Sequence, residues 1–152
     1  MFDDKIAVLI KAAKKLNEVS ITWAVGASLL LYLRGLTSEF HDIDIMVSKA
    51  QIEQVKEIFL TMEGLQDANL NGKFGMMEFV VDDVEIDIMD GFFEPSVGLY
   101  FVLGAGDIED WIEIGGERIP LQSLEEWKLF YGIMGRPEKV KLIELYLQNK
   151  LR

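Results

Sequence analysis

The sequence contains no cysteine, one histidine and only three prolines among its 152 residues. Without cysteine there can be no disulfide bonds and no thiolate metal ligands, which fits a reducing compartment. No apolar run approaches the roughly 20 residues that a membrane-spanning helix needs. The glycine fingerprint of dinucleotide-binding proteins and the P-loop lysine motif are both missing. These absences disfavour dinucleotide oxidoreduction and P-loop hydrolysis.

Basic residues are also scarce, with 15 Lys and Arg against 26 Asp and Glu and a formal net charge of −11. A field of this sign repels nucleic acid and favours a cationic small substrate or metal ions, while solubility alone is an equally good explanation. The N-terminus carries Asp3, Asp4 and scattered lysines instead of one apolar stretch. We therefore expect no signal peptide and a cytoplasmic protein.

The composition, 50% hydrophobic and 11% aromatic, predicts one globular domain over residues 1–152. Apolar spacings of three and four predict a helix over residues 3–18. Capping-box patterns predict helices that begin at residues 48–51 and 123–126. Pro137 is well placed to start a last helix, which runs to about residue 148.

Alternating apolar residues and turn signals predict the strands of a sheet. The expected strands are residues 21–25, 42–47, 79–81, 84–89, 99–102, 111–114 and 117–120. The predicted fold class is α/β (α+β), with a short, mixed, mostly antiparallel sheet flanked by helices. The sheet core spans about residues 20–120 and the C-terminal helices about residues 123–149.

The turn Gly26-Ala27-Ser28 lies between a buried strand and a short apolar helix. A small-residue turn that opens a helix presents backbone N–H groups and a positive dipole end, which suits a phosphate. Asp42 and Asp44 follow on the next strand and face the same side, because strand side chains alternate. Two neighbouring carboxylates repel each other, and a hard cation such as Mg²⁺ would neutralise them. This unit therefore predicts metal-dependent phosphoryl or nucleotidyl chemistry.

Asp87 occupies an Ile-Asp-Ile context like that of Asp44, and shares one strand face with Glu85. Glu85 is the second candidate for any role given to Asp87, and an ordinary exposed strand is the alternative for both. The single histidine, His41, precedes Asp42, so strand alternation directs it to the opposite face. A packing or hydrogen-bonding role is therefore expected for it.

These residues resemble a known pattern. Gly26-Ala27-Ser28 followed by Asp42-Ile43-Asp44 is similar to the G-[GAS]-S…D-h-D signature of the polymerase-β-like nucleotidyltransferase superfamily, where h is apolar. Residues 34–41 resemble the matching segment of small nucleotidyltransferases that act on aminoglycosides and lincosamides. The chain departs from that segment at Ser38 and Phe40, where those proteins tend to have Arg and His.

The C-terminal part of the chain also resembles small antibiotic and minimal nucleotidyltransferases. The resemblance therefore covers about residues 21–147. The matching positions are Pro120, Ser123, Glu125, Lys128, Gly135 and Arg136. The chain differs at Glu138-Lys139, where Lys-Asp is usual, and at Leu142, where Asp is common. Lys128 and Arg136 are then candidates to contact triphosphate oxygens, with surface ion pairs as the alternative.

The resemblance implies that two Mg²⁺ ions are held by Asp42, Asp44 and Asp87, with Asp87 also able to accept a proton. It implies that Gly26-Ala27-Ser28 and Lys128 bind a nucleoside triphosphate. The nucleoside monophosphate of this substrate, expected to be AMP, would then be transferred to a hydroxyl of a small molecule or protein. The alternative is an antitoxin-type or non-catalytic member that binds a partner protein. Antibiotic resistance, a toxin–antitoxin role and a homodimer are all compatible with the sequence.

Overall fold

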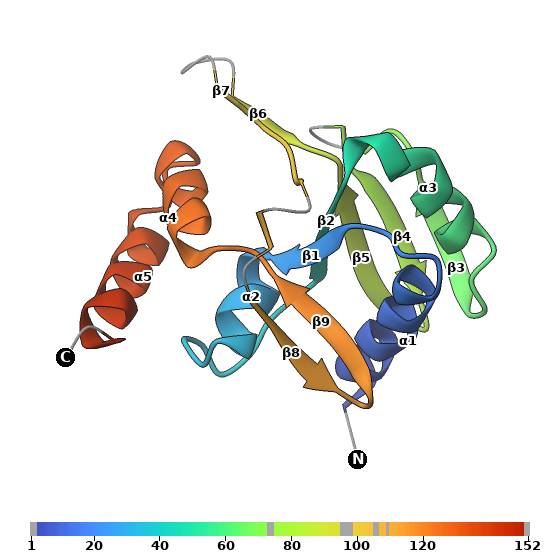
Figure 1. The fold of residues 1–152 in the computed structure, drawn as a ribbon, viewed down its shortest axis with the longest axis horizontal. Coiled ribbons are helices and arrows are strands. Elements are labelled where there is room, and N and C mark those ends of the chain that lie inside the picture. Colours follow the sequence, from blue (N-terminus) through green and yellow to red (C-terminus); the bar gives the residue numbers. More distant parts are fainter. Residues whose placement is uncertain (1–2, 73–74, 95–98, 105–106, 109, 151–152) are drawn as a thin grey trace.

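The computed structural model describes residues 3–72, 75–94, 99–104, 107–108 and 110–150 (Figure 1). Its elements in chain order are α1 (Asp4–Glu18), β1 (Trp23–Gly26), α2 (Ala27–Leu33), β2 (Ile43–Val47), the 3₁₀-helix η1 (Lys49–Gln51), α3 (Ile52–Leu60), β3 (Leu65–Asn69), β4 (Met77–Val81), β5 (Val84–Met89), β6 (Phe92–Glu94), β7 (Leu99–Phe101), β8 (Asp110–Ile114), β9 (Glu117–Leu121), α4 (Leu124–Ile133) and α5 (Pro137–Lys150). No helix in these ranges is both long enough and apolar enough to cross a membrane.

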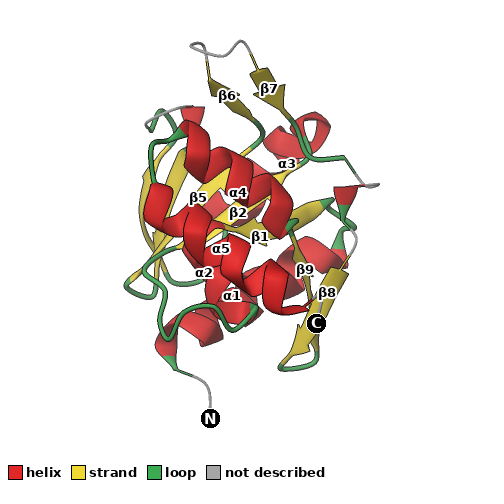
Figure 2. Ribbon diagram, turned by 90° about the vertical axis from the view of Figure 1, so that its left-hand side faces the viewer, coloured by secondary structure: helices red, strands yellow, loops and turns green. Residues whose placement is uncertain are grey.

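Seven strands form one mixed sheet in the order β3-β4-β5-β2-β1-β9-β8, and β6 pairs separately with β7. The β2–β5 and β1–β9 pairs are parallel, whereas the other neighbouring pairs are antiparallel. This confirms the predicted fold class. Helices α1 and α3 lie on one side of the sheet and α4 and α5 on the other, while the β6–β7 hairpin extends away from it (Figures 1 and 2).

The main core lies between the sheet and helices α1 and α3. Ile43 and Ile45 of β2 and Ile86 of β5 are fully buried on this face. Phe59 of α3 stacks on Phe79 of β4 with ring centroids 5.1 Å apart. Because strand side chains alternate, the residues between these positions point to the opposite face of the sheet. The apolar core thus fixes the direction of every acidic side chain on β2, β4 and β5.

The β4–β5 hairpin has the two-residue turn that Asp82-Asp83 between two apolar strands predicts. Asp82 and Asp83 both have left-handed backbone angles, with φ of 49° and 67°. Such turns match the twist of the flanking strands and fix their register. β4 begins at Met77, two residues earlier than predicted, and Glu78 consequently pairs with Asp87.

The first predicted capping box is wrong. Ser48 makes no side-chain cap, and residues Lys49–Gln51 form the 3₁₀-helix η1 before α3. The Gln51 carboxamide instead accepts a hydrogen bond from the backbone N–H of Thr22, at 2.8 Å, and so joins η1 to the start of β1. The second box is confirmed at its first residue, because Ser123 Oγ accepts from the N–H of Glu126 at 3.3 Å.

The segment after β5 contains one strand more than predicted. The sequence predicts a loop over residues 91–106 with one short strand near residues 99–102. In the structure, β6 pairs with β7 in an antiparallel hairpin. Gly91 and the aromatic residues that follow favoured a loop in the sequence, which obscured β6. Residues 95–98 and 105–106 of the predicted loop lie outside the described residues.

Candidate active site

Four sequence-distant residues lie in one row across the sheet. Gly26 of β1 pairs with Asp44 of β2, Asp44 pairs with Asp87 of β5, and Asp87 pairs with Glu78 of β4. Directly opposed residues of neighbouring strands project from the same face. Three carboxylates therefore stand side by side, next to the end of β1, on the face that the main core leaves free.

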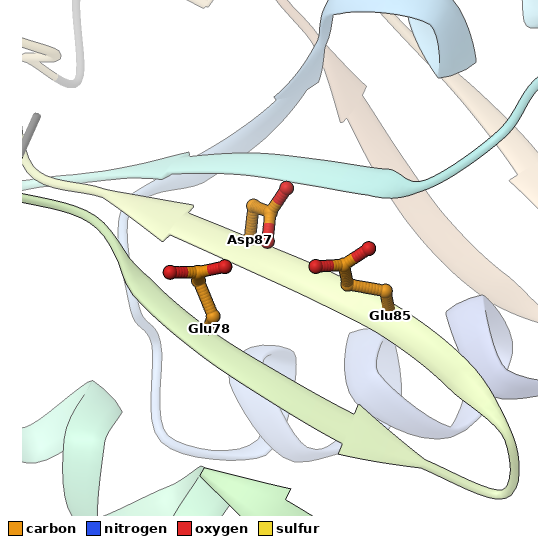
Figure 3. Close-up of side chains that lie close together, drawn as sticks. All are labelled: Glu78, Glu85 and Asp87. Carbon is orange, nitrogen blue, oxygen red and sulfur yellow. The ribbon is translucent and has the colours of Figure 1, made fainter. Parts of the chain in front are cut away.

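Two further carboxylates extend this row. Asp42 lies just before β2, close enough to Glu85 of β5 for its charge to raise the pKa of the Glu85 carboxyl. One carboxylate oxygen each from Glu78, Glu85 and Asp87 lies within 4.8 Å of the other two. Figure 3 shows these three side chains together on the β4–β5 surface. We refer to Asp42, Asp44, Glu78, Glu85 and Asp87 as the acidic cluster.

The cluster strongly opposes ionisation of its own members. Burial, then the charges of Asp87, Asp42 and Glu85, raises the pKa of Asp44 to about 8. Burial, followed by the charge of Glu85, raises the pKa of Asp87 to about 7. The charge of Asp42 is the largest cause that raises the pKa of Glu85, ahead of burial. Within the described part of the chain, no residue of the cluster forms an ion pair with a basic side chain. At neutral pH the cluster therefore has strong affinity for either protons or a cation.

The turn between β1 and α2 lies at one end of the row. Gly26 is extended, with φ −137° and ψ −168°, whereas Ala27 has a left-handed φ of 52°. This conformation costs an alanine about 1–2 kcal/mol, and such strain concentrates at functional sites. Ser28 Oγ accepts a long hydrogen bond, 3.5 Å, from the backbone N–H of His41. The turn is thereby joined to the residue before Asp42.

Helix α4 covers the same end of the row. Trp127 Nε1 donates to Gln122 Oε1 at 2.9 Å, and both groups lie over Gly26 where a side chain would project. Tyr131, one turn further along α4, is only 3% exposed. Its burial and the nearby charge of Asp44 raise the pKa of Tyr131 to about 12. The Gly26–Asp44 end of the row is thus covered, while the Glu85 end remains exposed.

Gly26 is required for steric reasons, because its φ is one that any residue can adopt. A Cβ there would overlap Gln122 Oε1 and lie 2.5 Å from Trp127 Nε1. We expect Gly26→Ala to lower the free energy of unfolding by about 1–3 kcal/mol, since α4 must move or the buried hydrogen bond must break. Thermal unfolding followed by circular dichroism measures this loss.

The matched control for this prediction is Gly132→Ala, a glycine-to-alanine change within α4 itself. A Cβ at Gly132 meets nothing nearer than Val140 Cγ2 at 3.8 Å, so we expect a gain of about 0.5–1 kcal/mol there. Equal stability of the two variants would contradict the close packing of α4 on Gly26.

The structure does not bring Lys128 or the His41 ring into the acidic cluster. Lys128 lies on α4 between Leu124 and Tyr131, and its ammonium pairs with Glu125 at 3.2 Å. The exposed His41 lines a separate cavity of about 370 Å³ together with Tyr32. Among the described residues, no contact joins its ring to the cluster. This agrees with the predicted direction of His41, whereas the role of Lys128 stays a prediction.

Glu78 and the residues of α4 that cover the row were not predicted from the sequence as part of the site. The signal for Glu78 was present: a two-residue turn at Asp82 and Asp83 places residue 78 opposite residue 87. The approach of Trp127 and Tyr131 had no such signal, because an apolar helix face does not specify which part of a sheet it covers.

No protein-family model matches the sequence, and no curated protein matches it. Solved structures match nearly the whole chain. A candidate nucleotidyltransferase from Thermotoga maritima superposes with a TM-score of 0.71 at 25% identity, over 98% of this chain and 96% of that one. The antibiotic-resistance factor ANT(2″)-Ia, in complex with adenylyl-2″-tobramycin, gives a TM-score of 0.63 at 14% identity, over 93% and 88%.

The lincosamide antibiotic adenylyltransferase LnuA, with lincomycin bound, gives a TM-score of 0.62 at 16% identity, over 95% of this chain and 97% of that one. With 93% or more of the chain matched, the similarities extend beyond the sheet into the C-terminal helical region. The shared fold therefore includes the sheet on which the acidic cluster lies.

Proposed function

The chain has the fold of the polymerase-β-like nucleotidyltransferase superfamily, and we propose that it is itself a metal-dependent nucleotidyltransferase. The observation that carries the proposal is the alignment of Gly26, Asp44 and Asp87 in one row. The sequence motifs that contain these residues are distant in the chain, yet the sheet register places them side by side. A shared fold alone would not require this arrangement of carboxylates.

The acidic cluster suits Mg²⁺. All of its ligand atoms are carboxylate oxygens, which hard divalent cations prefer. Asp87 Oδ1 is buried and has no hydrogen-bond partner among the described residues. We propose that Asp42, Asp44 and Asp87 hold two Mg²⁺ ions. When bound, these would neutralise phosphate charge and lower the pKa of an acceptor hydroxyl.

The chain's own residues would then position the nucleotide. The backbone N–H groups after Gly26 and the hydroxyl of Ser28 would bind the terminal phosphates of a nucleoside triphosphate. Lys128 lies on the face of α4 that includes Tyr131, and would reach the same phosphates once it leaves Glu125. Trp127 and Tyr131 would exclude water from the covered end of the row, which strengthens electrostatic interactions there.

Asp87 would act as the base. In the proposed step, the acceptor oxygen forms a bond to the α-phosphorus while the bond from that phosphorus to the β-phosphate oxygen breaks. The hydroxyl proton passes to an Asp87 carboxylate oxygen, and pyrophosphate leaves.

ATP is the first candidate donor, because ANT(2″)-Ia was solved with an adenylylated aminoglycoside and LnuA is described as an adenylyltransferase. We propose a hydroxyl of a small molecule as the acceptor, with a protein hydroxyl as the other possibility. The net charge of −11 favours a cationic acceptor over nucleic acid.

The direct test is isothermal titration of the protein with ATP in Mg²⁺ and in EDTA. We expect binding only with Mg²⁺, together with pyrophosphate release when nucleoside triphosphates are screened against hydroxyl-bearing acceptors. If no triphosphate binds in Mg²⁺, the enzymatic proposal fails, and the antitoxin-type function in which the chain binds a partner protein takes its place.

A further inference from the structure

We propose that Glu78, Glu85 and Asp87 form an additional binding site for a hard divalent cation, on the β4–β5 side of the acidic cluster. The site shares Asp87 with the proposed nucleotidyl-transfer site but needs no nucleotide. Glu78 belongs to none of the motifs on which the proposed function depends. The site therefore adds a cation ligand that the fold alone does not supply.

The hairpin geometry brings the three ligands together. Glu78 is paired directly with Asp87, while Glu85 lies two residues before Asp87 on the same strand face. One oxygen from each carboxylate lies within 4.8 Å of the others, a spacing that one cation can bridge. In Figure 3 the three carboxylate groups lie over the same part of the β4–β5 surface. Both strands are held in register by the tight turn, so little rearrangement is needed for binding.

The Asp87 carboxylate is itself buried and incompletely hydrogen-bonded. The residue is only 9% exposed, and its Oδ1 atom is buried without a hydrogen-bond partner. A buried carboxylate oxygen that lacks a donor is costly, because burial removes the water that would otherwise solvate it. A cation bound by Asp87 and the two glutamates would compensate the burial of the Asp87 carboxylate and remove the repulsion among all three side chains.

The surroundings leave the two glutamates available to a cation. Asn69 Nδ2 donates a long hydrogen bond, 3.4 Å, to Glu78 Oε1, which orients the side chain without neutralising it. Glu85 is exposed, so water can complete the coordination shell. The metal ligands would be carboxylate oxygens and water. Such ligands fit Mg²⁺, Mn²⁺ or Ca²⁺ and disfavour metals that select nitrogen or sulfur ligands.

The test is titration of the nucleotide-free protein with Mn²⁺, with free Mn²⁺ measured by electron paramagnetic resonance. We expect Glu78→Gln to weaken Mn²⁺ binding by at least about tenfold. The matched control is Glu113→Gln on β8, an exposed residue remote from the cluster, which makes the same change of net charge. It should bind Mn²⁺ within about twofold of the wild-type affinity. Equal affinities for the two variants would overturn the proposal.

A second pair of variants separates this site from the proposed enzymatic function. Glu85→Gln changes an exposed side chain, so it tests the same site with little risk to folding, and it should also weaken Mn²⁺ binding. Asp44→Asn should lose Mg²⁺-dependent ATP binding yet still bind Mn²⁺ at the Glu78 side. If Asp44→Asn abolishes Mn²⁺ binding while Glu78→Gln and Glu85→Gln leave it unchanged, the cation lies wholly at Asp44 and the additional site does not exist.

Discussion

Asp44→Asn is expected to abolish the Mg²⁺-dependent binding of a nucleoside triphosphate. Asp44 stands between Gly26 and Asp87 in the row, beside the turn that would hold the phosphates. Asparagine keeps the size of the side chain but removes the charge that a bound cation needs. Isothermal titration with ATP in Mg²⁺ measures the effect. Wild-type affinity in this variant would contradict a metal-binding role for Asp44.

Asp87→Asn should behave differently. Asp42 and Asp44 remain to hold the nucleotide with its cation, so ATP binding should persist. Loss of the proposed base should lower turnover by about 10²–10⁴-fold, measured as pyrophosphate release with an acceptor. The matched control is Asp83→Asn at the tip of the same hairpin, where the left-handed φ of 67° suits asparagine. If Asp83→Asn loses turnover and Asp87→Asn does not, Asp87 is not the base.

The contrast between these two aspartates shows what sequence could and could not predict. Strand alternation correctly assigned Asp44 and Asp87 to faces opposite the isoleucines beside them. It could not make them neighbours, because β2 and β5 are joined in parallel across 36 intervening residues and no local turn fixes such a register. Only the assembled sheet specifies which carboxylates meet.

Glu78 is the opposite case, because local chemistry was sufficient to place it. The turn at Asp82 and Asp83 fixes the pairing of the hairpin, but the strand was predicted to begin at residue 79. Met77 and Phe79 are both buried, and continuing this alternation by two residues would have put Glu78 opposite Asp87.

The acidic cluster should make the metal-free protein less stable as the pH rises. The pKa values of Asp44 and Asp87 are raised from 3.8 to about 8 and about 7. Above about pH 4 the folded protein keeps protons that the unfolded chain loses. The associated stability is therefore full below pH 3.8 and is lost as the pH rises through 7–8. Between pH 3.8 and its own folded-state pKa, each group lowers the free energy of unfolding by at most about 1.4 kcal/mol per pH unit.

Thermal unfolding in EDTA between pH 5 and pH 8 measures this effect, with Asp44→Asn as the diagnostic variant. Asparagine holds no titrating proton, so the melting temperature of the variant should fall less steeply than that of the wild type. At pH 8 the variant should be the more stable protein, because the repulsion that Asp44 exerts on Asp87 and Asp42 is gone. Mg²⁺ at pH 8 should raise the wild-type melting temperature, since a bound cation replaces the lost protons. Parallel melting curves for the two proteins across this range would show that Asp44 titrates like an ordinary exposed carboxylate.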